Sequence, residues 1–366
     1  MTFLTSLTMS HFRSHKKAKF DLDKRPVAIS GPNGSGKTNI LEAVSLFSPG
    51  RGIRGASAES MMRKPDCVGW KITGHAMADE RVMEIVFSYM NGAARDVMID
   101  GKNATQFALA QHSRVLWLVP SMDRLWIEGA EGRRRFLDRI SLSFFPTHAE
   151  NTLRYEKSMR QRNKLLKDQV RDPHWYKALE RQMAEAGAAI NTARKQALKF
   201  ILSSQQDTTT EFPVAELKLQ QNEGSLPETV EDLYDAFEES RFRDLATGRT
   251  MVGPHKTDVY GAYPAKGVPA SQCSTGEQKA LLISIVLANA RALARDHRKA
   301  PLLLLDEISA HLDRDRRAAL YEEICTLGLQ AWLTGTERYL FEEFGNRAQY
   351  IQVDSMDNIS QSSLTD

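Results

Sequence analysis

Residues 30–39 read SGPNGSGKTN, and this stretch constrains the fold more than any other part of the sequence. Positions 31–38 fit the pattern G-x-x-x-x-G-K-[ST], which predicts a phosphate-binding loop when a strand precedes it and a helix follows. The short apolar run 27–29 predicts that strand, and the spacing of Ile40, Val44 and Phe47 predicts the helix. The sequence therefore predicts an α/β fold built around a P-loop.

The chemistry of the loop follows from its residue types. Its glycines permit tight turns, so that successive N–H groups and the helix N-terminus face the phosphates. Lys37 is expected to reach the β- and γ-phosphates, and the Thr38 hydroxyl to bind Mg²⁺. The predicted nucleotide contacts are Gly31, Pro32, Asn33, Gly34, Ser35, Gly36, Lys37 and Thr38. A glycine-rich turn that only caps a helix is the alternative, and the Lys-Thr pair with its flanks disfavours it.

A second motif supplies the acidic half of such a site. The segment APLLLLDEISAHLD (300–313) contains a continuous apolar run, as in a buried parallel strand, and the run ends at Asp306. A P-loop ATPase needs an acidic residue there to organise Mg²⁺. We expect Asp306 to hold the metal and Glu307 to polarise the attacking water. A solvent-exposed Asp-Glu pair after a buried strand is the alternative.

The spacing of the motifs indicates an inserted lobe. Lys37 and Asp306 lie 269 positions apart, which is more than one compact P-loop domain requires. Ser274, Thr275 and Gly276 open a predicted helix just upstream of the acidic strand, where Ser274 and Glu277 form a capping box. In addition to capping, Ser274 and Gly276 are expected to favour a bound phosphate, because a helix N-terminus attracts anions.

The order of loop, insertion, S-x-G-[QE] signature and acidic strand resembles the ATP-binding-cassette family. This resemblance implies that the signature of one subunit closes on ATP held by another, so that ATP promotes a homodimer. Within that superfamily, GPNGSGKTN together with FRS near position 12 is similar to the chromosome-maintenance group that includes Rad50 and SMC proteins. Their long coiled coil is not expected, because helices predicted at 155–168 and 175–203 sustain no heptad repeat.

Four segments resemble the RecF family in particular, and with the nucleotide motifs they cover essentially the whole chain. They are EGRRRFLDRI (131–140), RQRNKLL (160–166), RTMVGPHKTDV (249–259) and TGEQKALL (275–282). The resemblance implies a P-loop ABC-type ATPase head with an inserted, mainly helical arm lobe. We expect residues 1–145 and 246–366 to form the head and residues 146–245 to form the arm.

The sequence departs from the cassette pattern at three places. No glutamine that could sense the γ-phosphate occurs in 113–126, and Thr334 and Thr336 stand where a switch histidine is expected. The first signature glycine is Thr275. These departures favour slow ATP hydrolysis and an ATP-timed clamp rather than a motor. We expect a weak DNA-dependent ATPase that is chiefly an ATP- and DNA-binding protein.

Charge is distributed unevenly along the chain although the net charge is only +3. Residues 131–171 carry a net +6 and residues 205–240 a net −9. Basic side chains that could contact DNA phosphates are Arg133, Arg134, Arg154, Lys157, Arg160, Lys164 and Lys167. A solvated helix face paired with the acidic segment is the alternative.

The kind of DNA contact can also be predicted. The sequence has no basic stripe with interleaved aromatic residues that would indicate base stacking, so contacts with the DNA backbone are expected. His255 is expected to be structural rather than catalytic.

Composition and the chain's N-terminal residues favour a cytoplasmic protein. The three cysteines have no paired spacing, and the longest apolar run (280–290) is too short to span a bilayer. The first 20 residues lack the pattern of a signal peptide.

Three functions from different classes remain open. The resemblance implies an ATP-dependent DNA-binding protein of repair, recombination and replication, which assists RecA loading on gapped DNA with RecO and RecR and supports SOS induction. The second is a single-cassette ATPase that acts on a protein partner without contacting DNA. The third is a nuclease, which the sequence disfavours because no further carboxylate cluster for two metals is visible.

Overall fold

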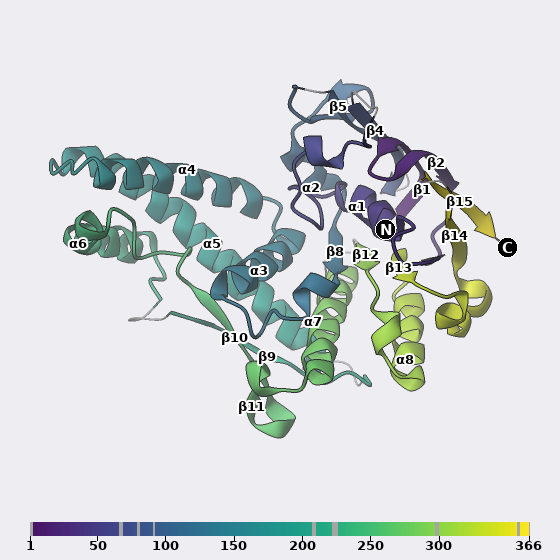
Figure 1. Cartoon of the computed structure of the whole chain (residues 1–366). Coiled ribbons are helices and arrows are strands. Elements are labelled where there is room, and N and C mark those ends of the chain that lie inside the picture. The colour runs from purple at the N-terminus through teal and green to yellow at the C-terminus, as the bar shows by residue number, and fades with distance from the viewer. Residues whose placement is uncertain are drawn as a thin grey trace. The chain divides into compact units, whose positions relative to one another are not determined.

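The computed structural model describes residues 3–65, 69–78, 81–90, 92–206, 210–221, 226–296, 300–356 and 359–365. The chain divides into two compact units. Unit 1 comprises Met1–Asp123, Thr208–Pro213 and Thr275–Asp366, and unit 2 comprises Arg124–Asp207 and Val214–Ser274. Both units are drawn in Figure 1.

Unit 1 contains an antiparallel sheet formed by strands between residues 3 and 103. Its strand order is β2 (His15–Asp21), β1 (Phe3–Phe12), β4 (Gly69–Ala78), β5 (Arg81–Met90), β6 (Asp96–Ile99) and β7 (Lys102–Asn103). One face is buried, because side chains such as Leu7, Met9 and Ile72 alternate with more exposed neighbours along the strands.

The second sheet of unit 1 has a parallel centre. Its order is β15 (Ile359–Thr365), β14 (Gln349–Met356), β3 (Val27–Ser30), β13 (Ala331–Gly335), β12 (Leu302–Leu305) and β8 (Val115–Leu118). Only β15 pairs in the antiparallel sense. The four leucines of β12 are all buried, as expected for a central strand covered on both faces.

Helix α1 (Lys37–Ser45) belongs to the hydrophobic core that both sheets share. Ile40, Leu41 and Val44 are fully buried in one cluster with side chains from both sheets. Gln330 adds a polar link, since its side-chain amide accepts from the Leu4 N–H (2.9 Å) and donates to the Leu4 carbonyl (2.8 Å). The other helices of unit 1 are α2 (Leu109–His112), α7 (Thr275–Asp296), α8 (Arg314–Thr326), η1 (Glu59–Met61), η2 (Gln106–Ala108), η3 (Pro120–Met122), η6 (Ser309–His311) and η7 (Arg338–Arg347).

Unit 2 is mainly helical. Its helices are α3 (Ala130–Phe144), α4 (His148–Lys167), α5 (His174–Gln206), α6 (Val230–Thr247), η4 (Pro264–Lys266) and η5 (Ala270–Gln272). Its sheet has the order β11 (Val268–Pro269), β10 (Asp258–Tyr263) and β9 (Glu216–Gln220). Helices α4 and α5 lie side by side along much of their length (Figure 1).

Helix α6 is capped at both ends by residues suited to these positions. Thr229 and Asp232 form a capping box at the start of α6, and Gly248 ends that helix in the left-handed conformation.

The longest helix is α5, with 33 residues, and α4 begins seven residues before the helix predicted from the sequence. Among the described residues, no helix is both long and apolar enough to cross a membrane.

The cysteines do not form a metal site in the part of the chain that the structure describes. Cys273 is buried and Cys325 is half-buried, and neither is part of a disulfide bond. No group of three or more His, Cys, Asp or Glu side chains lies close enough to hold a metal within these residues. Cys67 lies outside the described residues.

Candidate nucleotide site

The P-loop connects the buried strand β3 to helix α1, in the order that the sequence predicts. Gly31, Gly34 and Gly36 have φ angles of +150°, +80° and +102°, which other residues adopt only with strain. A Cβ atom at Gly31 would lie 2.1 Å from the carbonyl oxygen of Val353 on β14. Between these glycines, Pro32 and Asn33 are exposed and Ser35 is buried. Glycine is therefore required where the loop leaves the sheet.

Lys37 is buried at the first position of α1. Its ammonium donates hydrogen bonds to the carbonyls of Gly31 (2.7 Å) and Pro32 (2.8 Å). Burial lowers the pKa of Lys37, whereas the negative charges of Glu307 and Asp306 oppose this shift. The lysine and both carboxylates thus share one electrostatic environment.

The acidic residues reach the loop from the end of β12. The Thr38 hydroxyl donates to both carboxylate oxygens of Asp306, at 3.0 and 3.2 Å, across 268 positions of sequence. A hydroxyl beside a carboxylate offers the oxygen ligands that Mg²⁺ prefers. The residues present therefore fit a Mg²⁺ ion, which Thr38 and Asp306 would hold.

Thr334 completes this cluster, and its role was not predicted from the sequence. It lies on β13, which separates β3 from β12 in the sheet. The buried Thr334 hydroxyl donates to Asp306 Oδ1 (2.7 Å) and accepts the Glu307 N–H (3.0 Å). The sequence showed only that this residue was not a histidine, and the strand order was needed to place it beside Asp306.

The hairpin between β1 and β2 supports the other side of the loop. Fully buried His15 contacts the Gly36 carbonyl through Nε2 (3.1 Å), and burial lowers the pKa of its imidazole. Arg13 makes a bidentate pair with the buried carboxylate of Glu42 on α1 (2.8 and 2.6 Å), and Arg54 contacts the same carboxylate (2.9 Å). The sequence analysis uses the FRS segment only as a sign of family resemblance. It does not predict these contacts, because FRS and the P-loop are separate segments of the sequence.

The signature residues lie at the start of α7. The helix begins at Thr275, so Ser274 stands at the position before its first residue. Ser274 and Gly276 are exposed, and a Cβ atom at Gly276 would meet no atom within 4 Å. The capping box and the phosphate contact predicted for these residues stay predictions.

The seven basic side chains predicted to contact DNA fall into two groups. Arg133 makes a bidentate ion pair with Asp258 (2.8 Å), and Arg134 donates to the Thr257 carbonyl (3.2 Å). Arg154 pairs with Glu185 (2.6 Å), and Arg160 lies 3.6 Å from Glu156. In contrast, three of the seven predicted DNA contacts are exposed and have no ion pair within the described residues, namely Lys157, Lys164 and Lys167.

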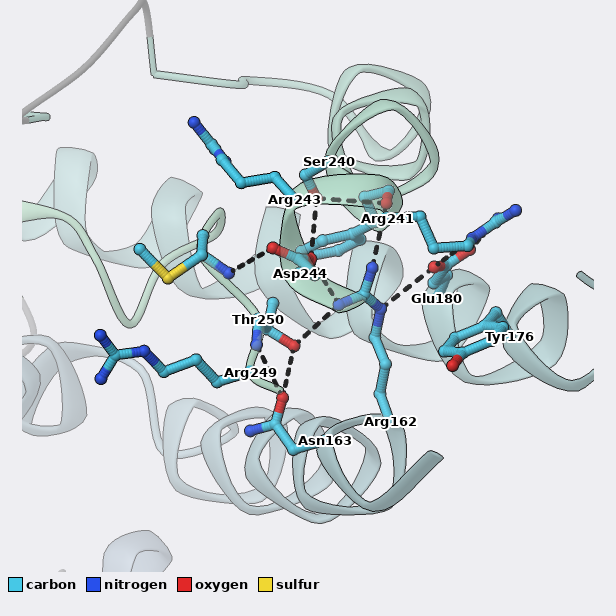
Figure 2. Close-up of polar contacts among 12 residues, drawn as sticks. Arg162, Asn163, Tyr176, Glu180, Ser240, Arg241, Arg243, Asp244, Arg249 and Thr250 are labelled. Carbon is cyan, nitrogen blue, oxygen red and sulfur yellow. Dashed lines mark hydrogen bonds and ion pairs between the residues drawn. The ribbon is translucent and has the colours of Figure 1, made fainter. Parts of the chain in front are cut away.

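Two of the segments that carry the family resemblance meet inside unit 2. Arg162, from RQRNKLL, is fully buried and donates to Glu180 (3.0 Å), Asp244 (2.7 Å), Thr250 (2.9 Å) and the Phe237 carbonyl (3.0 Å). Thr250 belongs to RTMVGPHKTDV. Figure 2 shows the arginine reaching from α4 toward α6 and the residue 250 segment.

His255, from the same segment, also makes structural contacts. Its Nδ1 lies 2.7 Å from the Tyr155 hydroxyl and its Nε2 lies 3.1 Å from the Thr250 carbonyl. Burial lowers the pKa of His255 to about 4, and the positive charges of Lys256, Arg134 and Arg162 act in the same direction. Tyr155 therefore donates to a neutral imidazole.

Fold and site together define a P-loop ATPase head of the ABC type with an inserted, mainly helical lobe. Residues 3–360 match the family described as RecF/RecN/SMC N terminal domain. The chain is 43% identical to the DNA replication and repair protein RecF of Rhizobium rhizogenes, with 96% of both chains covered, and 43% identical to RecF of Brucella suis, with 95% of this chain and 93% of that protein covered. The chain belongs to the RecF family.

Solved structures agree with this assignment of the fold. A structure described as the recombination mediator protein RecF-ATPrS in the RecFOR pathway matches with a TM-score of 0.85 at 23% identity, covering 99% of this chain and 98% of that one. The Smc head domain from Pyrococcus furiosus matches with a TM-score of 0.59 at 18% identity, and the match covers 100% of this chain and 96% of that one. The predicted fold class and family are therefore confirmed.

Proposed function

We propose that this chain is an ATP-dependent DNA-binding protein of DNA repair, recombination and replication, and that it forms a homodimer when it binds ATP. The observation that carries the proposal is the Thr38–Asp306 contact, which joins the P-loop to the acidic strand beside Lys37 and Glu307. The names of the relatives support the role in replication and repair.

In this proposal the residues of the site have separate tasks. The loop from Gly31 to Gly36 presents backbone N–H groups to the phosphates, and Lys37 exchanges its two carbonyl contacts for phosphate oxygens. Thr38 and Asp306 bind Mg²⁺, which neutralises charge that develops on the phosphates. Glu307 orients water for slow hydrolysis. Ser274 and Gly276 contact the nucleotide of a second copy, which their exposure permits.

DNA binding is assigned to exposed lysines on α4. Lys157, Lys164 and Lys167 have no intramolecular ion pair within the described residues, whereas Arg133 and Arg134 are engaged internally. Lysines in this arrangement suit contacts with a phosphate backbone rather than base readout. By their family resemblance, RecO and RecR are the expected partners on gapped DNA, with RecA loading and SOS induction as the outcome.

The proposal is tested by measuring binding to gapped, duplex and single-stranded DNA, with and without ATP, across a salt series. We expect ATP-dependent binding that weakens steeply with salt. The Lys37→Arg variant is expected to lose hydrolysis and ATP-dependent binding while keeping its fold. Absence of salt-sensitive binding in every condition would reject the DNA role and favour an ATPase that acts on a protein partner.

Dimer formation has its own test in light scattering. Glu307→Gln is expected to bind ATP without hydrolysing it, so that the measured mass doubles at saturating ATP. Glu342→Gln is the matched control, because Glu342 is an exposed glutamate on η7. A Glu307→Gln variant that remains monomeric with bound ATP would contradict the assignment of Ser274 and Gly276.

A further inference from the structure

The strand between the two nucleotide-motif strands carries a buried hydroxyl group. β13 pairs with β3 on one side and with β12 on the other, in parallel register. Thr334 lies beside Ile29 of β3, two residues before Gly31, where the P-loop begins. Its side chain is completely buried, and it is the polar residue of an otherwise apolar strand. A buried hydroxyl costs free energy unless it is hydrogen-bonded, so the partners of Thr334 are informative.

The Thr334 hydroxyl both donates and accepts a hydrogen bond. The single hydroxyl proton goes to Asp306 Oδ1 at 2.7 Å, and a lone pair accepts the Glu307 N–H at 3.0 Å. Asp306 Oδ1 also accepts from Thr38 at 3.0 Å, so two threonines, one on helix α1 and one on strand β13, contact the same carboxylate oxygen. Thr38 also contacts Oδ2 at 3.2 Å, so the hydrogen bonds of the two threonines fix the direction of the whole carboxylate.

The backbone of Glu307 needs such support. Its φ angle is +53°, in the left-handed region that a non-glycine residue rarely occupies. Such a conformation persists only where the surroundings stabilise it, and it occurs often at functional sites. The Thr334 hydroxyl accepts from the N–H of this residue, and therefore limits rotation of the peptide that directs the Glu307 side chain.

We propose that Thr334 is a positioning residue for the nucleotide site. It holds the metal-binding carboxylate of Asp306 and the backbone of Glu307 in one fixed arrangement, through a hydroxyl that contacts neither nucleotide nor metal. The inference rests on the proposed function of these two acidic residues. Because β13 is also the neighbour of the P-loop strand, Thr334 couples the acidic half of the site to the phosphate-binding half.

The test compares Thr334→Val, which keeps the side-chain shape and removes the hydroxyl, with Thr334→Ser, which keeps the hydroxyl and removes a methyl group. The first measurement is the affinity for a non-hydrolysable ATP analogue with and without Mg²⁺. The ratio of these affinities reports on the metal site alone, because Lys37 and the loop bind the analogue in both conditions. The second measurement is the rate of ATP hydrolysis in a single turnover.

We expect Thr334→Val to reduce the Mg²⁺-dependent part of the affinity and the hydrolysis rate by about 10–100-fold, as for other residues that orient a metal ligand. Affinity without Mg²⁺ is expected to change by less than about threefold. Thr334→Ser is expected to recover most of both losses. If valine leaves the ratio unchanged, or if serine is as impaired as valine, Thr334 only fills space and the inference is wrong.

The readouts also separate this inference from the proposed function. If the unmodified protein binds the analogue with Mg²⁺ but does not hydrolyse ATP, the proposed role of Glu307 fails, and the affinity ratio still decides the role of Thr334. If the unmodified protein binds no nucleotide, both are overturned. A melting temperature close to that of the unmodified protein shows that each variant is folded.

Discussion

Gly31 shows how much a single position can determine in this molecule. The loop turns there with a φ of +150°, and the space for a side chain is occupied by the Val353 carbonyl, 2.1 Å from an added Cβ. A methyl group at this position must displace either β14 or the loop itself. The P-loop pattern requires glycine here, and the structure supplies a packing reason in addition to the conformational one.

Gly31→Ala is therefore expected to lower ATP affinity by at least about tenfold and to reduce the melting temperature, because strain and a steric clash act together. Gly34→Ala is the matched control. Its φ of +80° also disfavours alanine, but an added Cβ atom meets nothing within 4 Å. Equal ATP affinities of the two variants in equilibrium titrations would contradict the role assigned to the Val353 contact.

The low pKa of His255 predicts how the stability of the protein depends on pH. Its folded-state pKa of about 4 lies below the ordinary value of 6.5, because burial disfavours the cation. Above pH 6.5 neither state is protonated at this group. As the pH falls from 6.5 toward 4, the unfolded chain takes up a proton that the folded chain does not, and stability decreases by up to about 3 kcal/mol.

Urea unfolding at pH 7.5 and pH 4.5 measures this dependence. The loss of stability between these pH values is expected to be smaller in His255→Gln than in the unmodified protein. Other groups titrate in both proteins, so the difference between the two losses isolates His255. Identical losses would show that the imidazole is not held neutral by the fold.

At the scale of elements, the arm helices are joined by a buried ionic network rather than by an apolar seam alone. Arg162 on α4 contacts Glu180 on α5 and Asp244 on α6, all three side chains being fully buried (Figure 2). Arg241 adds a second cation on Glu180 at 2.6 Å. Such a network specifies how the helices align, because each charge is stable only when its partners are in place.

Arg162→Met is expected to destabilise the protein by about 3–5 kcal/mol, since it leaves buried carboxylates without their partner. Lys164→Met, on the exposed face of the same helix, is expected to change stability by less than about 0.5 kcal/mol. Denaturant unfolding and hydrogen exchange in α4–α6 measure both effects. Similar stabilities of the two variants would mean that solvent reaches the network and screens it.

These elements also show what the sequence could and could not predict. The strand–loop–helix around Lys37 and the strand before Asp306 were predicted correctly, because their signals are contiguous. Arg162 was missed, since a buried arginine looks like an exposed one in sequence and its partners lie 18 to 88 positions away. Thr334 and His15 were missed for the same reason. The contacts of Thr334 depend on which strands are neighbours in the parallel sheet, and the contact of His15 depends on the packing of the β1–β2 hairpin against the P-loop.

At the scale of the whole molecule, charge rather than shape predicts where DNA binds. Replacement of Lys157, Lys164 and Lys167 by glutamine is expected to weaken DNA binding at low salt and to reduce the slope of log affinity against log salt by about 2–3, because each contact releases counterions. The matched control replaces the exposed Lys24, Lys71 and Lys102 of unit 1. A salt slope that is unchanged by the first set, or reduced equally by both, would place the DNA elsewhere.

The order of strands in the central sheet has a consequence for how the protein is made. The P-loop strand β3 has both of its neighbours, β13 and β14, about 300 residues later in the chain. A ribosome that adds roughly 5–20 residues per second leaves that apolar strand unpaired for about 15–60 seconds. An exposed strand with two open edges invites aggregation during this interval. The yield of active protein is therefore expected to depend on the speed of translation and on chaperones that cover residues 27–30.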